Sequence, residues 1–158
     1  MFDKGIIKYP EESCFSFGGG EPTILENFDE FIYMLLDKGC KNIRINTSGI
    51  KYSKGIERGL KEGSVSIVIS TDSGGKQTYE KIKRVKTYDK VWKNIAKYRK
   101  AACRENLVKV KYIILPGIND NYEEIENWFK DIIKNKVKGV CVSVEEQWYF
   151  KNFATTKK

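Results

Sequence analysis

Phe15-Ser16-Phe17-Gly18-Gly19-Gly20-Glu21-Pro22-Thr23 is the stretch around which the rest of the chain is organised. An apolar strand ends here in three consecutive glycines, and an acid and a proline follow before the next helix. Glycine permits a positive φ and has no Cβ to keep a ligand away from the backbone. Ligands of α/β proteins bind at the carboxyl ends of strands. The turn is therefore a candidate binding site, although the glycines alone also suit a plain strand-to-helix loop.

The bulk composition is that of a globular domain. The chain has 158 residues, of which 41% are hydrophobic and 32% charged, so it is long enough for one domain with its own core. No apolar run approaches membrane-spanning length, and residues 1–5 lack the pattern of a signal peptide. We therefore expect a cytoplasmic protein with no membrane partner. The net charge of +8 comes from lysines spread along the chain, without interleaved aromatic residues, so nucleic acid is not an expected partner.

The cysteines and histidines limit the chemistry. The four cysteines, Cys14, Cys40, Cys103 and Cys141, are far apart, so we expect small buried hydrophobes and no metal site. Histidine is absent, which excludes His-ligated zinc and histidine bases within this chain.

Strand and helix patterns alternate along the chain. We predict strands at 13–17, 42–46, 64–70, 107–115 and 140–144, with helices after Asn27, over about 53–62, over about 77–104 with a break near 87–89, and from about 121. Such crossovers imply a parallel sheet. The predicted fold is α/β, a partial (β/α) TIM-type barrel of about five strands, and an open flavodoxin-like sheet is the alternative. Residues 1–12 form a lead-in, 13–150 the barrel domain and 151–158 a frayed tail.

Caps and apolar stripes support the helices. Asn27 and Asn121 are candidate N-caps that Glu30 and Glu124 would complete as capping boxes, and Thr87 is a third candidate cap. The first and last helices carry apolar residues at helical spacing, which predicts buried stripes. Their members are Phe28, Phe31, Ile32, Leu35 and Leu36 in the first, and Ile125, Trp128, Phe129, Ile132 and Ile133 in the last.

Polar residues follow every predicted strand. Because the carboxyl ends of parallel strands share one edge, we expect these side chains around one mouth. They are Glu21, Thr47, Ser48, Ser70, Asp72, Asn119 and Glu145.

Taken together, these motifs resemble the radical S-adenosylmethionine enzymes, and in particular pyruvate formate-lyase activating enzymes and their relatives. The glycine turn resembles that family's Gly-Gly-Glu-Pro motif at the end of its second barrel strand. Asn46-Thr47-Ser48-Gly49, Ile69-Ser70-Thr71-Asp72 and Leu115-Pro116-Gly117-Ile118-Asn119-Asp120 resemble the ends of the next three strands. The resemblance covers roughly residues 13–145, and the order and spacing of its motifs are more specific than any one of them.

The resemblance implies a function and a cofactor site. In the intact protein, a [4Fe-4S] cluster would reductively cleave S-adenosylmethionine to a 5′-deoxyadenosyl radical that abstracts hydrogen from substrate. Gly19, Gly20, Glu21 and Pro22 would hold the methionine amino group, since carbonyls and a carboxylate accept hydrogen bonds from an ammonium. The remaining implied binding residues are Ser70 and Asp72, facing the ribose or the methionine carboxylate, and, as weaker candidates, Thr47, Ser48 and Asn119.

One part of the family pattern is missing. The family's three cluster cysteines, Cys-x3-Cys-x2-Cys, lie upstream of the glycine motif, where this chain has only Cys14. We therefore expect the chain alone to be inactive, either as a fragment or as a degenerate relative. The alternative function is a non-catalytic barrel that binds S-adenosylmethionine or a nucleotide, or acts as a scaffold.

The partners follow in part from the same resemblance. The substrate is unknown, with a protein or peptide as one candidate, and a flavodoxin or ferredoxin would reduce the intact enzyme. Glu145, Trp148 and Tyr149 lie where substrate contacts could begin. An unpaired parallel edge at 13–17 predicts dimerisation or poor solubility unless the lead-in covers it.

Overall fold

Five parallel strands form one sheet in the computed structural model, which describes residues 9–144. Helices or 3-10 turns lie between the strands, as the alternating sequence pattern predicts. The order is β1 (Cys14–Phe17), η1 (Pro22–Ile24), α1 (Phe28–Asp37), β2 (Asn42–Thr47), α2 (Lys54–Glu62), β3 (Val65–Ser70), α3 (Lys76–Lys83), α4 (Tyr88–Ala101), η2 (Glu105–Leu107), β4 (Val108–Ile114), α5 (Tyr122–Lys134) and β5 (Gly139–Val144).

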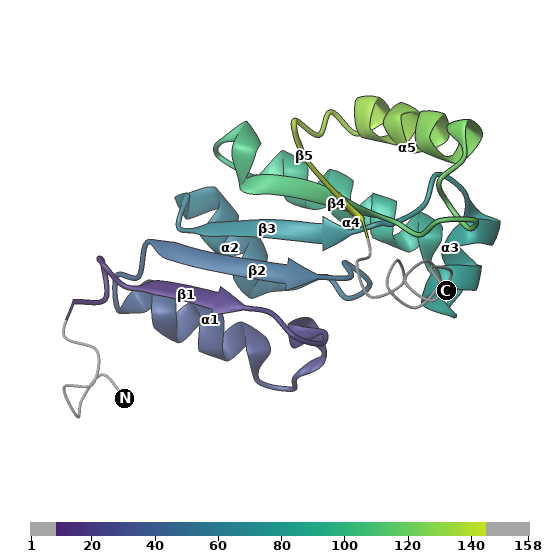
Figure 1. Ribbon diagram of the computed structural model, residues 1–158. Helices are drawn as coiled ribbons and strands as arrows, with labels where there is room; N and C mark the ends of the chain where they lie inside the picture. Colours follow the sequence, from purple (N-terminus) through teal and green to yellow (C-terminus); the bar gives the residue numbers. More distant parts are fainter. Residues whose placement is uncertain (1–8, 145–158) are drawn as a thin grey trace, which may run out of the picture.

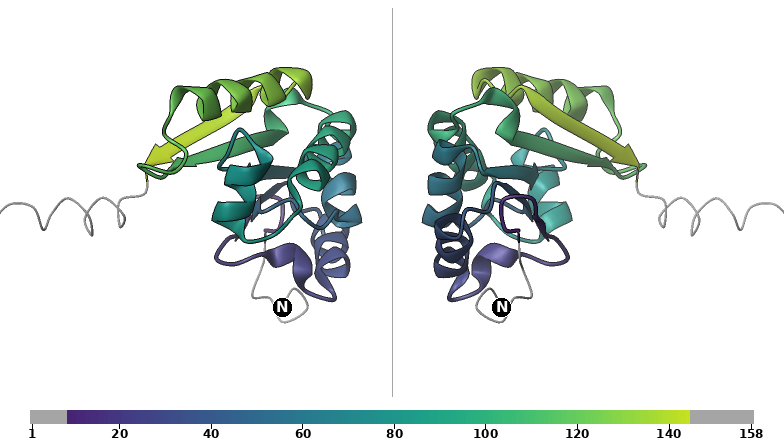
Figure 2. Two further views of the ribbon diagram at one scale, coloured as in Figure 1. Left: turned by 90° about the vertical axis from the view of Figure 1, so that its right-hand side faces the viewer. Right: turned by 90° about the vertical axis from the view of Figure 1, so that its left-hand side faces the viewer.

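The strand order confirms the partial barrel. The strands lie in the order β1-β2-β3-β4-β5, and every neighbouring pair is parallel. Because each crossover advances by one strand in the same direction, α1, α2, α4 and α5 cover one face of a curved sheet (Figures 1 and 2). A flavodoxin-like sheet would reverse direction part-way and carry helices on both faces. We call the helix-covered side the outer face and the opposite side the inner face.

The core lies between the sheet and these helices. Alternate residues of the three central strands point to the outer face and are buried, for example Ile45, Ile67 and Val110. The helices contribute Ile32, Leu35, Ile56, Leu60, Trp92, Ile95, Tyr98 and Trp128 to the same core. Within residues 9–144, no helix is both long and apolar enough to span a membrane.

The apolar stripes of the first and last helices are only partly buried. Trp128 and Ile132 are buried in α5, but Phe129 and Ile133 are 45% and 74% exposed. The sheet ends at β5, beyond which no described strand pairs. In α1, Phe31 is 38% exposed and packs edge-on against Phe17. Periodicity therefore located the helices correctly but predicted more burial than the fold provides.

All three predicted N-caps lie at helix starts, but only one of them makes the expected side-chain hydrogen bond. Asn121 accepts the N–H of Glu124, but Asn27 and Thr87 make no side-chain cap hydrogen bond. The carboxylate of Glu124 bonds the N–H of Gly74 and the hydroxyl of Thr78, so it does not complete the predicted box. A side chain at a helix start bonds whichever donor the tertiary fold brings nearest, and sequence spacing cannot rank distant donors.

The cysteines correct the expectation of burial. Cys40 is buried, whereas Cys14 and Cys103 are exposed and Cys141 is half-buried. Cys14 and Cys141 lie on the inner face of the two edge strands, where no helix covers them. Strand position alone therefore did not imply burial.

Candidate functional site

A carboxylate held by hydrogen bonds lies at the carboxyl end of β1. Oε1 of Glu21 accepts bonds from the Thr23 hydroxyl at 2.6 Å, the Thr23 N–H at 3.2 Å and the Thr47 hydroxyl at 2.6 Å. Oε2 accepts one bond, from the N–H of Ser48. A carboxylate oxygen has about two lone-pair directions. Oε1 is thus fully used, and Oε2 keeps acceptor capacity for a ligand.

This network keeps Glu21 ionised. Partial burial would by itself raise the pKa of the carboxyl, but hydrogen bonds involving Ser48, Thr23 and Thr47 outweigh it and the pKa lies below its ordinary value. The carboxylate is therefore charged at neutral pH and fixed in direction. Both features suit the binding of a cationic group.

The turn before Glu21 leaves room for a ligand. Gly19 and Gly20 have φ values of +78° and +81°, in the left-handed region that favours glycine. A Cβ built on either residue meets no atom within 4 Å. Pro22 then begins the 3-10 turn that Glu21 caps with its own side chain. Thus the backbone is open to solvent beside a fixed carboxylate.

A second polar cluster joins the ends of β3 and β4. Asp72 has a φ of +52° and is 3% exposed, and its Oδ1 accepts the N–H of Ile113 at 2.8 Å. Its Oδ2 pairs with the ammonium of Lys83. Asn119 is fully buried and donates to the carbonyls of Asp72 and Ile113 while accepting the N–H of Leu115. Both side chains therefore hold loops together.

The described mouth residues form two groups, and Ser70 belongs to neither. Glu21, Thr47 and Ser48 are in direct contact, as expected from their positions at strand ends. Ser70 is half-buried at the end of β3, and its hydroxyl makes no hydrogen bond within residues 9–144. Asp72 and Asn119 form the separate loop cluster, and Glu145, Trp148 and Tyr149 lie outside the described residues.

Sequence reasoning missed two partners of these residues. Thr23 is buried and donates to Glu21, a role that its place in the motif does not predict. Lys83 comes from the end of α3, eleven residues after Asp72, and no spacing rule marks it. A hydroxyl two residues after a turn carboxylate is the one local signal that could have identified Thr23.

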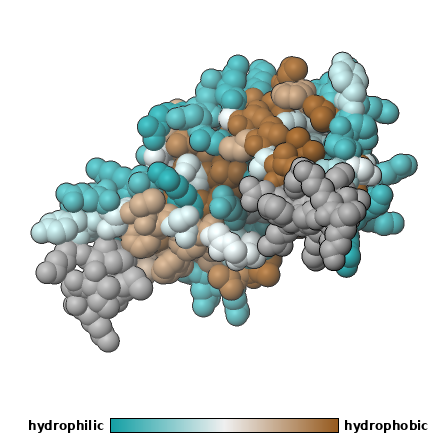
Figure 3. All heavy atoms as spheres, in the orientation of Figure 1, coloured by the Kyte–Doolittle hydropathy of each residue, from teal (hydrophilic) through white to brown (hydrophobic). Residues whose placement is uncertain are grey.

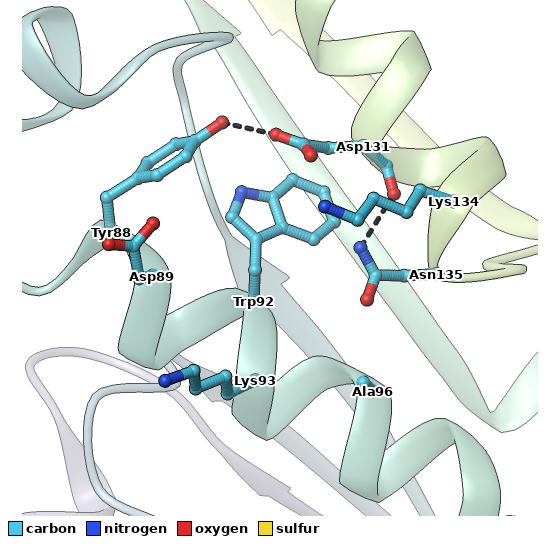
Figure 4. Close-up of a pocket in the computed structure, with 8 residues that line it drawn as sticks. All are labelled: Tyr88, Asp89, Trp92, Lys93, Ala96, Asp131, Lys134 and Asn135. Atoms are coloured by element: carbon cyan, nitrogen blue, oxygen red, sulfur yellow. Dashed lines mark hydrogen bonds between the residues drawn. The ribbon is translucent and has the colours of Figure 1, made fainter.

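A groove of about 300 Å³ between α4 and α5 lies apart from these groups (Figure 4). Tyr88 and Trp92 of α4 face Asp131 and Lys134 of α5 across it, and the Tyr88 hydroxyl donates to Asp131. Burial and the neighbouring carboxylate raise the pKa of Tyr88 well above its ordinary value, so it stays protonated as a donor. The groove contains none of the polar residues from the strand ends.

The family model of the radical SAM superfamily matches residues 3–142. The chain belongs to the radical SAM superfamily. Among curated relatives, a mitochondrial GTP 3′,8-cyclase of Arabidopsis thaliana is 38% identical over 105 residues, which are 65% of this chain and 26% of that protein. The chain thus spans about a quarter of the length of this relative.

Solved structures support the fold. The anSMEcpe enzyme with bound AdoMet and a Kp18Cys peptide aligns over 85% of this chain and 39% of its own, with 18% identity and a TM-score of 0.62. A domain of a pyruvate-formate lyase-activating enzyme from Bacteroides vulgatus aligns over 82% of this chain and 98% of its own, with 12% identity and a TM-score of 0.56. These structural alignments show a shared fold.

The superfamily implies two cofactors, S-adenosylmethionine and a [4Fe-4S] cluster, and the described residues fit only the first. The open turn and the remaining acceptor capacity of Glu21 Oε2 suit the ammonium of S-adenosylmethionine. Cluster ligation needs several converging thiolates. Within residues 9–144, no group of three or more His, Cys, Asp or Glu residues could hold a metal ion. The described part of the chain therefore carries residues that suit S-adenosylmethionine, and none of its residues form a cluster site.

Proposed function

We propose that this chain is the S-adenosylmethionine-binding core of a radical SAM enzyme and needs cluster ligands beyond the described residues for activity. The observation that carries the proposal is the Glu21 carboxylate beside an open glycine turn. Its Oε1 is saturated, whereas Oε2 accepts one bond, from the Ser48 N–H, and keeps capacity for another. Bound in an intact enzyme, S-adenosylmethionine is the source of a 5′-deoxyadenosyl radical that takes hydrogen from substrate. The chain without its cluster ligands is inactive in this reaction.

Each candidate residue has a role in this proposal. Glu21 accepts a hydrogen bond from the methionine ammonium, and the carbonyls of Gly19 and Gly20 accept the others. Pro22 directs the chain away from the site, and Thr47 and Ser48 hold the Glu21 carboxylate in place. The unbonded Ser70 hydroxyl is available to the ribose or the methionine carboxylate. Asp72 and Asn119 act as positioning residues that fix the β3 and β4 loops.

The substrate and reductant extend the proposal. The printed names of the relatives offer two substrate classes, a nucleotide for the GTP 3′,8-cyclase and a peptide for the anSMEcpe complex. A flavodoxin or ferredoxin is the proposed electron donor of the intact enzyme.

Calorimetry with S-adenosylmethionine tests the binding site directly. We expect the chain to bind the ligand and Glu21→Gln to weaken binding at least tenfold, because the amide loses the charge that attracts the ammonium. Glu26→Gln, an exposed carboxylate five residues later, is the matched control and should bind normally. Absence of heat with the unaltered chain, or equal affinity in Glu21→Gln, would contradict the proposal.

A non-catalytic binding module is the second candidate, favoured by the lack of a metal-ligating group within residues 9–144. Both candidates bind S-adenosylmethionine, so calorimetry does not separate them. The gene sequence upstream of the Met1 codon does. Three clustered cysteine codons in the same frame support the enzyme, and their absence supports the binding module.

A further inference from the structure

The inner face of the sheet carries positive charge without negative charge. Alternate residues of the strands point to this face, and their register places Arg44 beside Ser66, Lys109 beside Val68, and Lys111 beside Ser70. The strand residues on this face include these three cations and no Asp or Glu. The strand residues of the inner face are Cys14, Ser16, Asn42, Arg44, Asn46, Ser66, Val68, Ser70, Lys109, Lys111, Ile113, Gly139, Cys141 and Ser143.

None of these three cations forms an ion pair within residues 9–144. Ion pairs within residues 9–144 engage Lys54, Arg58, Lys61, Lys76, Lys83, Arg99 and Lys130, but not Arg44, Lys109 or Lys111. Lys109 and Lys111 are also half-buried. Like charges gathered on a curved face repel each other and concentrate anions there. The face therefore attracts anions.

A hollow on this face brings suitable donors together. Its volume is about 530 Å³, within the usual range for small-molecule sites. Arg44, Lys109 and Asn46 line it with guanidinium, ammonium and amide groups, and Ser16 and Ser66 add hydroxyls. Guanidinium binds phosphate through two parallel hydrogen bonds, and ammonium adds a point charge.

Gly139 of β5 leaves space for the Lys109 side chain. A Cβ at Gly139 of β5 would lie 2.4 Å from Cγ of Lys109, so the lysine stem occupies the space that a side chain would take. Glycine at this position therefore lets Lys109 lie along the inner face. The hollow lies on the same sheet as the Glu21 turn. Arg44, which lines the hollow, precedes Ser48, which bonds Glu21, by four residues, or roughly 13 Å of extended chain.

From this arrangement we infer that the inner face binds a small phosphate-bearing substrate through Arg44 and Lys109, with Lys111 adding charge. The inference rests on the proposed function, because it assigns the substrate class of the same core. A small molecule is favoured over nucleic acid because the donors line one hollow rather than a long track.

Binding of inorganic tripolyphosphate at fixed salt tests the inference. We expect the paired variant Arg44→Gln, Lys109→Gln to weaken binding at least tenfold. Lys90→Gln, an exposed lysine on the outer helix α4, should change it less than twofold. An equal loss in both variants would show non-specific attraction and overturn the inference, as would no loss in the paired variant.

Two further measurements separate the possible failures. The paired variant should still bind S-adenosylmethionine, which shows that it folds, and Glu21→Gln should still bind tripolyphosphate. If tripolyphosphate binds while S-adenosylmethionine does not, the proposed function fails and the anion site stands. A single-stranded RNA that binds more than tenfold tighter than tripolyphosphate and depends on Arg44 and Lys109 would overturn the choice of a small molecule.

Discussion

Thr47 is one of the residues whose hydrogen bonds lower the pKa of the Glu21 carboxyl. Its hydroxyl donates to Oε1 of Glu21 and accepts the N–H of Gly49 at 3.0 Å, and the side chain is buried. Hydrogen bonds to the charged form lower the pKa of Glu21, so the stability they contribute is present above the ordinary carboxyl pKa and lost as pH falls through the lowered value. Affinity for S-adenosylmethionine should follow the same titration.

We therefore predict that Thr47→Val moves the loss of S-adenosylmethionine binding to higher pH. Valine keeps the shape but removes the donor, at a cost of roughly 1–3 kcal/mol for the buried groups left unpaired. Calorimetry between pH 4 and 7 measures the shift. Thr47→Ser retains the hydroxyl and is the control. Identical pH profiles for Thr47→Val and the unaltered chain would contradict the role given to Thr47.

The sequence predicted the edge at which polar residues would gather. It did not predict which of their side chains keep hydrogen-bonding capacity for a ligand. Glu21, Thr47 and Ser48 meet as expected, since parallel strands end at one edge. Asp72 and Asn119 lie at the same edge, yet the Asp72 side chain accepts the N–H of Ile113 and the Asn119 side chain donates to the carbonyl of Asp72. A strand-end position fixes the edge on which a side chain lies. Its hydrogen-bond partners depend on loop conformation, which a spacing pattern does not encode.

At the scale of elements, the loop after β3 packs against the first turn of α5. Gly74 donates to Glu124, and a Cβ at Gly74 would lie 1.8 Å from the Glu124 carbonyl oxygen. No rotamer relieves that contact, because both groups belong to the backbone. We predict that Gly74→Ala lowers the free energy of unfolding by about 3 kcal/mol, at the upper end of overpacking effects.

Thermal or urea unfolding of the two neighbouring glycines tests this packing. At Gly75, a Cβ would meet only the Glu124 carboxylate, at 3.4 Å, and the backbone is extended. Gly75→Ala should therefore change stability by less than half as much as Gly74→Ala. Equal effects at both positions would mean that loop flexibility, rather than contact with α5, sets the cost.

The start of α2 shows a helix cap that the sequence could not predict. Asp29 of α1 accepts bonds from Lys54 N–H, Gly55 N–H and the Ser53 hydroxyl, so it caps α2 from a neighbouring helix. Sequence analysis identified the start of α2 but no role for Asp29, which lies 24 residues before Ser53. Strand and helix positions follow from short-range periodicity, whereas this cap requires two helices to pack first.

For the whole molecule, strand order was predictable because consecutive crossovers of one hand build the sheet outward one strand at a time. Burial at its margins was not predictable. The β5 margin exposes an apolar strip, consisting of Phe129, Ile133, Val140, Val142 and Val144. Hydrophobic residues (brown) gather along β5 in Figure 3. Apolar strips of this kind drive association when nothing covers them.

We predict that the chain on its own self-associates through this strip. The paired variant Ile133→Gln, Val142→Thr removes two of its most exposed members, 74% and 56% exposed, and keeps the strand propensity of position 142. Light scattering across a hundredfold concentration range should show a lower mass for the variant than for the unaltered chain. Leu25→Gln, at a leucine next to η1 that is 61% exposed, is the control and should not change the mass.

The unpaired edge of β1 offers a competing route to the same association. Cys14 is exposed on that edge strand, and a lysine there would hinder strand pairing between copies. If Cys14→Lys abolishes the larger species while Ile133→Gln, Val142→Thr leaves it intact, association runs through β1 and the prediction for the strip is wrong. If only the strip variant lowers the mass, the chains associate mainly through the uncovered outer face of β5. Association there removes apolar surface from water.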